Sequence, residues 1–169
     1  QIAVTGTLGA SAAGLAILQG KTSQTTGDVR SLIEHHQRPR PRVSEGQALV
    51  KAGARCAMDV SDGLLSDLAK ICAASGNAAR VDASQVPVHI EATKAFPETA
   101  LAMALNGGED YELLFLASSS VIATLHGKLE HGFHVIGTII DGTPGQVAVI
   151  DRDGVSMDVQ SAGWDHLKS

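Results

Sequence analysis

Residues 55–76 constrain the fold most, because an apolar segment runs through an acidic turn directly into an amphipathic pattern. Cys56-Ala57-Met58 predicts the end of a short buried strand, and Asp59-Val60-Ser61-Asp62-Gly63 follows at once. Apolar residues then recur with helical spacing at Leu64, Leu65, Leu68 and Ile71. This spacing predicts a helix from Ser61 to Gly76, so the segment is expected to be a strand–turn–helix unit.

The same alternation of short strands and helices extends over the whole chain. Strands are expected at 1–5, 55–59, 79–81, 111–116, 133–140 and 146–151. Helices are expected at 11–18, 28–36, 45–52, 61–76, 98–105 and 119–129. Several strands follow one another without an intervening helix. The pattern therefore favours an α/β-plait sandwich, a mixed sheet with helices, over a doubly wound parallel sheet.

Composition sets the class of protein. A chain of 169 residues with 44% hydrophobic and 3% aromatic residues can bury one good core. The net charge of −5 argues against nucleic-acid binding. No apolar run approaches the length of a membrane span, so no membrane association is expected. Cys56 and Cys72 lie on apolar segments without zinc-site spacing, which indicates reduced core thiols and a cytoplasmic protein.

The acidic turn combines residue types that can hold a metal and a phosphate together. Asp59 is expected at the strand end and Asp62 in the first helical turn, so both carboxylates can face one ion. Ser61 can cap the helix or contact a phosphate oxygen. The alternative is purely structural, because Ser and Asp are common at helix starts.

A second loop, Gly107-Gly108-Glu109-Asp110, precedes an apolar strand. Two glycines permit close approach of another backbone or of a ligand. The acidic pair would then lie at the mouth of a buried strand, where site residues are common. A simple turn before a core strand explains the same residues.

Three other features carry weaker signals. The turn Thr5-Gly6-Thr7-Leu8-Gly9 lacks the Lys-Ser/Thr of a phosphate-binding loop. The basic run Arg38–Arg42 is interpreted as a solvated linker. Trp164 is the only tryptophan, and it is either a hydrophobic anchor for the tail or an aromatic platform for a flat ring.

Taken in order, these motifs resemble the C-terminal half of the thiamine-monophosphate kinase family. The stretches that carry the resemblance are 4–15, Met58-Asp59-Val60-Ser61-Asp62-Gly63-Leu64, Gly107-Gly108-Glu109-Asp110-Tyr111-Glu112-Leu113 and Gly163-Trp164-Asp165-His166. The superfamily also includes aminoimidazole ribonucleotide synthetase, selenophosphate synthetase and the hydrogenase-maturation dehydratases.

The resemblance implies ATP-dependent phosphorylation of thiamine monophosphate to thiamine diphosphate. It assigns Mg²⁺ to Asp59 and Asp62, and a contact with ATP to Ser61. It assigns contacts with thiamine monophosphate to Glu109 and Trp164. No catalytic nucleophile is required, because phosphoryl transfer depends mainly on positioning and charge neutralisation.

The resemblance also implies what the chain lacks. Residues 1–169 are expected to be one C-terminal domain of a two-domain enzyme. The N-terminal half would carry further Mg²⁺-binding aspartates, much of the nucleotide site and the surface of a homodimer. The chain alone is then expected to fold without turnover. It also departs from the family at Ala10, where an Asp is usual, and Ser11 is expected to cap the helix instead.

Two other functions remain open. One is another ATP-using synthetase of the same superfamily. The other is a non-catalytic binding or assembly domain that keeps the fold.

Overall fold

A computed structural model of the chain describes residues 1–21 and 28–158. Within this part, a six-stranded mixed sheet has the order β2-β4-β1-β5-β3-β6. Its strands are β1 (Ile2–Thr5), β2 (Cys56–Asp59), β3 (Ala78–Asp82), β4 (Leu113–Leu116), β5 (Phe133–Ile140) and β6 (Val147–Ile150). Neighbouring strands are antiparallel except for the parallel pair β3–β6.

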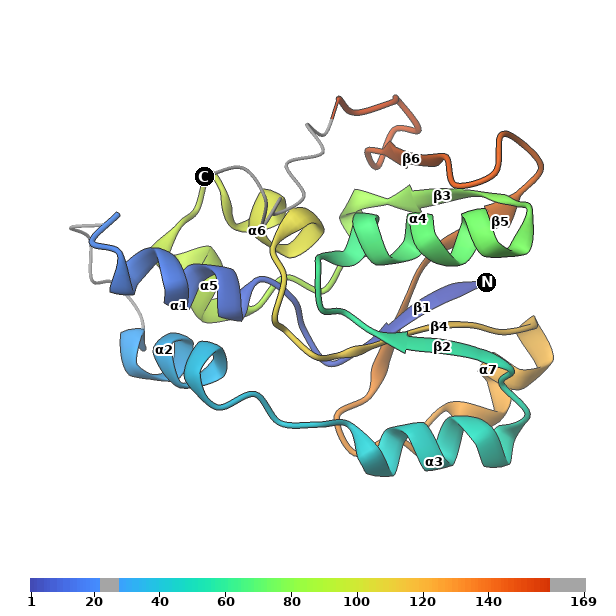
Figure 1. The fold of residues 1–169 in the computed structure, drawn as a ribbon, viewed down its shortest axis with the longest axis horizontal. Coiled ribbons are helices and arrows are strands. Elements are labelled where there is room, and N and C mark those ends of the chain that lie inside the picture. The colour runs from blue at the N-terminus through green and yellow to red at the C-terminus, as the bar shows by residue number, and fades with distance from the viewer. Residues whose placement is uncertain (22–27, 159–169) are drawn as a thin grey trace.

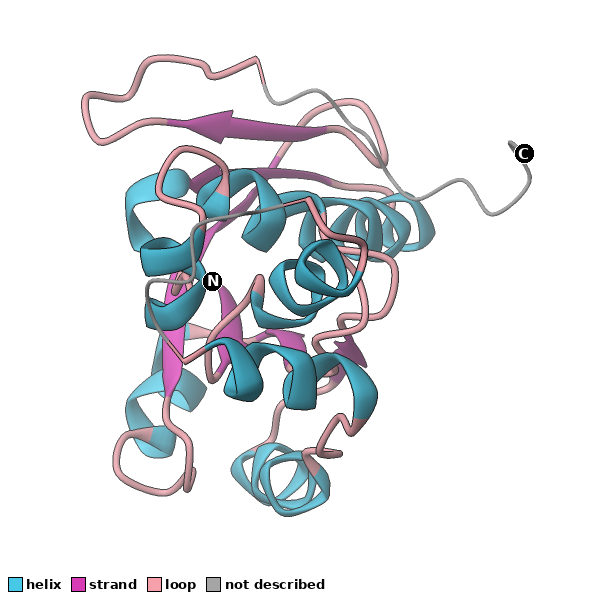
Figure 2. Ribbon diagram, turned by 90° about the vertical axis from the view of Figure 1, so that its left-hand side faces the viewer, coloured by secondary structure: helices cyan, strands magenta, loops and turns pink. Residues whose placement is uncertain are grey.

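Helices lie on both sides of this sheet. They are α1 (Ala10–Leu18), α2 (Val29–Gln37), α3 (Val43–Ala52), α4 (Leu64–Ser75), α5 (Ile90–Ala95), α6 (Ala100–Asn106) and α7 (Ser119–Leu125), with a 3₁₀ turn at Ala83–Gln85. In Figure 1, α4 lies on one side of the sheet and α3 and α7 lie on the other. Figure 2 shows the helices gathered around the strands in a second view. The predicted class, a mixed sheet sandwiched by helices, is confirmed.

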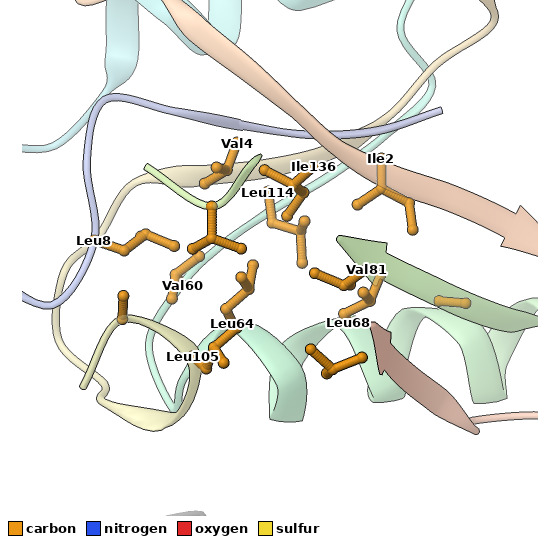
Figure 3. Close-up of a cluster of buried hydrophobic side chains, with 14 of the residues drawn as sticks. Ile2, Val4, Leu8, Val60, Leu64, Leu68, Val81, Leu105, Leu114 and Ile136 are labelled. Carbon is orange, nitrogen blue, oxygen red and sulfur yellow. The ribbon is translucent and has the colours of Figure 1, made fainter. Parts of the chain in front are cut away.

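The sandwich follows from strands that are apolar on both faces. In β1, Ile2 and Val4 join a core with Leu64 and Leu68 of α4, as Figure 3 shows. Ala3 points the other way because side chains alternate along a strand. It joins a second core whose members are Leu49 of α3, Phe115 of β4, and Ile122, Leu125 and Leu129 in and after α7.

A third apolar cluster joins α1, α2 and α5 beside the sheet. Ala13, Leu32 and Ala92 are each fully buried there. Gly14 allows the close contact between α1 and α2, since a Cβ at this position would lie 2.2 Å from the carbonyl oxygen of Leu32. The cluster holds α1 and α2 near the loop that follows β1.

Several predicted boundaries are wrong. Helix α4 begins at Leu64, not at Ser61, because Gly63 is its N-cap with φ 119° and no side chain caps it. Asp62 therefore precedes the helix. Strand β4 begins at Leu113, two residues late, because Tyr111 has φ +52°. Helix α7 ends at Leu125, and α5 was not predicted. None of the described helices is long and apolar enough to cross a membrane.

Candidate functional site

The two motif loops cross each other where β2 ends and β4 begins. The amide N–H of Glu109 donates to the carbonyl of Ser61 at 2.9 Å, and the N–H of Tyr111 donates to Val60 at 3.0 Å. The N–H of Val60 in turn donates to the carbonyl of Glu112 at 2.8 Å. Backbone hydrogen bonds therefore fix the 60–63 turn directly against the 107–112 loop.

The glycine pair makes this crossing possible. A Cβ on Gly108 would lie 2.3 Å from the carbonyl oxygen of Ser61. A Cβ on Gly107 would lie 2.4 Å from the carbonyl oxygen of Met103 and 2.5 Å from the Cβ of Ala12. The sequence-based interpretation, that a glycine admits another backbone, is confirmed for Gly108, whereas Gly107 lies against the end of its own helix and the side chain of Ala12.

The crossing forms one wall of a pocket of about 390 Å³, completed by α1, α2 and α6. Ser61, Asp62 and Glu109 all line it. Leu15 and Met103 are among its apolar lining residues. The pocket thus presents an apolar surface and carboxylates to one small ligand, the usual composition of a ligand site. Trp164 lies outside the described residues.

Asp59 is exposed at the end of β2 and lines a neighbouring, more apolar cleft together with Tyr111. The phenol of Tyr111 donates to Glu109 Oε2 at 3.3 Å. Burial, followed by Glu109 and then by the charges of Asp59 and Asp62, raises the pKa of Tyr111. Tyr111 therefore lies within the field of all three predicted carboxylates, although the sequence did not single it out as a site residue.

The backbone of this loop is strained. Glu109 has φ +68° and Tyr111 has φ +52°, in the left-handed region that residues with a Cβ seldom adopt. Such conformations persist where surrounding contacts enforce them, and they concentrate at functional sites. Here the enforcing contacts are the backbone hydrogen bonds from the 60–63 turn.

The donor set around Asp62 fits a small hard cation. No group of three or more His, Cys, Asp or Glu residues in 1–21 and 28–158 is arranged to hold a metal by itself. Mg²⁺ commonly uses only one or two carboxylates, with waters and substrate phosphates as its other ligands. The ammonium of Lys70 contacts Asp62 and Asp67, so both carboxylates are paired with a positive charge. That Asp59 and Asp62 share one ion stays a prediction.

Asp67 fixes the turn that carries Ser61 and Asp62. Its fully buried side chain accepts hydrogen bonds through Oδ2 from the N–H of Ser61 at 2.9 Å and from the N–H of Asp62 at 3.0 Å. Sequence reasoning missed Asp67, but a signal was present. Asp67 follows Leu64 by three residues and precedes Ile71 by four, which places a carboxylate on the apolar face of α4.

A buried ion pair supports the other loop. Arg42 donates to Glu112 through Nε at 2.8 Å and through Nη2 at 2.6 Å. Thr5 Oγ1 also donates to Glu112, at 2.6 Å, and accepts from the N–H of Leu113 at 2.9 Å. The prediction that Arg38–Arg42 is a solvated linker is therefore wrong for Arg42, whose side chain is only 12% exposed.

The carboxyl group of Asp110 lies at the start of α1. Its carboxylate accepts from the N–H of Gly9 at 2.7 Å and from the N–H of Ser11 at 3.0 Å. No side chain from the helix itself caps α1, so the expected cap by Ser11 is wrong. Burial raises the pKa of Asp110 to about 7, although the backbone N–H groups act to lower it.

Residues 1–150 match the family of AIR synthase related proteins, C-terminal domain. The chain belongs to this family. The family of the chain therefore agrees with the resemblance noted from the motifs.

Two curated relatives of the chain are thiamine-monophosphate kinases. The chain is 42% identical over 176 residues to the thiamine-monophosphate kinase of Escherichia coli K12, which covers 98% of the chain and 52% of that protein. The thiamine-monophosphate kinase of Bacillus subtilis is 36% identical, with the same coverage. The chain thus spans about half the length of the curated relatives that it matches.

Solved structures support the fold. The thiamine-monophosphate kinase of Stenotrophomonas maltophilia K279a superposes with a TM-score of 0.78 at 39% identity, over 92% of this chain and 50% of that chain. The structure of AaThiL complexed with AMPPCP and TMP has a TM-score of 0.76 at 29% identity, over 93% and 48%. The hydrogenase maturation protein HypE of E. coli, at 20% identity and a TM-score of 0.63, shares the fold.

Proposed function

We propose that the chain is one half of a thiamine-monophosphate kinase, which transfers the terminal phosphoryl group of ATP to thiamine monophosphate. The observation that carries this proposal is the convergence of Ser61, Asp62 and Glu109 on one pocket. These residues come from two motifs that lie more than forty positions apart in the sequence. The similarity to thiamine-monophosphate kinases then supports the choice of substrate.

The proposal assigns a ligand contact to each predicted site residue. Glu109 would hold the acceptor, since thiamine carries a positively charged ring that a carboxylate can face. Ser61 would contact the nucleotide. Asp59 and Asp62 would hold Mg²⁺, whose chemistry is to neutralise the charge on the phosphates. Trp164 would lie beside the acceptor. The chain itself needs no nucleophile, because the acceptor phosphate attacks directly.

The same proposal covers the two ligands, the domain organisation and the assembly of the enzyme. The AaThiL structure holds AMPPCP and TMP together, as a kinase with a nucleotide donor and a phosphate acceptor would. Since the chain spans half of its relatives, residues 1–169 would act as one domain of a longer enzyme. That enzyme would be a cytoplasmic homodimer, joined through the other half.

The test is an assay of thiamine diphosphate formation by the full-length protein that contains this chain. Glu109→Gln should raise KM for thiamine monophosphate about tenfold or more, with KM for ATP nearly unchanged. Glu98→Gln, in the exposed loop before α6, is the matched control and should leave both values unchanged. The 169-residue chain alone should show no turnover. Product formation by that chain would contradict the proposed division of the site.

The acceptor can be distinguished from that of another synthetase of this fold. Trp164→Ala in the full-length protein should weaken binding of thiamine monophosphate far more than binding of ATP, because an aromatic ring stacks on the acceptor heterocycle. An equal loss for both ligands would count against this acceptor.

A further inference from the structure

A lysine already occupies the cation position of the proposed metal site. Lys70 lies on α4, and its ammonium contacts the carboxylate of Asp62. The same ammonium lies 2.7 Å from Asp67 Oδ1. Asp62 and Lys70 are each about half exposed, at 46% and 49%, whereas the side chain of Asp67 is completely buried. One ammonium group is thus shared between a half-exposed carboxylate and a buried one.

Asp67 uses its two oxygens for different purposes. Oδ2 accepts the N–H groups of Ser61 and Asp62, and Oδ1 accepts the ammonium of Lys70. Because Asp67 is buried and fully hydrogen-bonded, it cannot turn away without leaving a buried charge unpaired. Asp67 therefore stays in place, and any change at this site falls on Asp62 and Lys70.

The carboxylate of Asp62 cannot bind the ammonium of Lys70 and a divalent cation equally well at the same time. Both cations would use the same carboxylate oxygens, and each would repel the other at contact distance. The lysine side chain has a flexible four-carbon stem, so its ammonium can leave Asp62 while it remains at Asp67. The geometry therefore allows an exchange of one cation for another without movement of the 60–63 turn.

We propose that Lys70 is a resident counter-ion of Asp62, which neutralises this carboxylate when no divalent cation is bound and which the cation must displace. Lys70 thereby lowers the affinity of the site for metal. The inference rests on the proposed function, because it takes Asp62 as a metal ligand.

Mn²⁺ is the probe for the test, because it accepts the same oxygen ligands as Mg²⁺. The concentration of free Mn²⁺ is measured directly by electron paramagnetic resonance. Binding is measured on the full-length protein that contains this chain. Lys70→Gln should lower the dissociation constant for Mn²⁺ about twofold to fivefold, the range of a partly exposed ion pair. Lys70→Arg keeps the charge and should keep an affinity close to that of the unchanged chain.

Lys94→Gln is the matched control. Lys94 is 51% exposed and pairs with Glu91 at the same i,i+3 spacing on another helix, so its removal should leave Mn²⁺ binding unchanged. Asp62→Asn should weaken binding at least tenfold, and in that background Lys70→Gln should have no further effect. Thermal unfolding of each variant checks that the chain remains folded.

The outcomes separate the two ideas. If Asp62→Asn weakens binding while Lys70→Gln leaves it unchanged or weaker, the counter-ion role is overturned and the metal site stands. If Asp62→Asn leaves Mn²⁺ binding unchanged, or if the full-length protein binds no Mn²⁺, Asp62 is not a metal ligand of this chain. That result overturns the counter-ion role together with the proposed metal site.

Discussion

Arg42 and Glu112 form a two-point ion pair beneath the 109–112 loop, although seventy positions separate them in the sequence. Both side chains are largely buried, at 12% and 5% exposed. Because Thr5 also binds Glu112, the pair ties the end of β1 and the start of α3 to the strained loop that carries Glu109. The ion pair is therefore part of what holds the candidate site in shape.

Loss of Arg42 should destabilise the chain strongly. Arg42→Leu leaves Glu112 as a buried charge with only the hydroxyl of Thr5, which should lower the free energy of unfolding by about 3 kcal/mol. Adding Glu112→Gln should recover part of this loss. Arg40→Leu is the control: Arg40 is exposed and has no ion pair in the described part of the chain, so its effect should stay within about 0.5 kcal/mol. If urea unfolding showed the same loss of stability for Arg42→Leu and Arg40→Leu, the stabilising role of the Arg42–Glu112 ion pair would be refuted.

A methyl group on Gly108 should disrupt the crossing of the two loops. Its Cβ would meet the carbonyl oxygen of Ser61 at 2.3 Å, and backbone atoms on both sides would have to move. Gly108→Ala should therefore lower the free energy of unfolding by roughly 2 kcal/mol or more. Gly46→Ala, within α3, is the matched control, since its Cβ would make only an ordinary 3.7 Å contact with Leu113 Cδ1. That control should be neutral or stabilise by about 1 kcal/mol.

Asp110 predicts an unusual pH dependence of stability. Its pKa is about 7 in the folded chain and 3.8 as the reference value, so the folded state binds more protons between these values. The free energy of unfolding should then fall as pH rises from about 4 to 7, on the order of 2–4 kcal/mol. Urea unfolding at pH 5 and pH 8 tests this against Asp110→Asn, which removes the titration. A chain that gains stability over Asp110→Asn as pH rises would show that the start of α1 favours the ionised carboxylate instead.

Much of the fold was predictable, because both faces of the strands are apolar and the helix of residues 64–75 has a clear amphipathic pattern. The short helix α5 was not, since six residues give too little periodicity to separate a helix from a connector. The late start of β4 could not be predicted either, because a tyrosine such as Tyr111 gives no indication of a left-handed backbone. That conformation arises from contacts with a turn fifty positions earlier.

The site was predictable in part for the same reason. The two motifs named Ser61, Asp62 and Glu109, and the structure brings these residues to one pocket. The residues that support them were not found, because Asp67, Arg42 and Asp110 act through partners chosen by the fold. A charged residue on an apolar helix face, as at Asp67, was the one local clue.

The most direct test of the proposed acceptor pocket is a nuclear magnetic resonance titration of the ¹⁵N-labelled chain with thiamine monophosphate and Mg²⁺. The account predicts that the amide signals of Ser61, Asp62, Gly108 and Glu109 shift together, and that Glu109→Gln sharply reduces these shifts. An unperturbed spectrum at millimolar ligand, or shifts confined to residues outside this pocket, would contradict it.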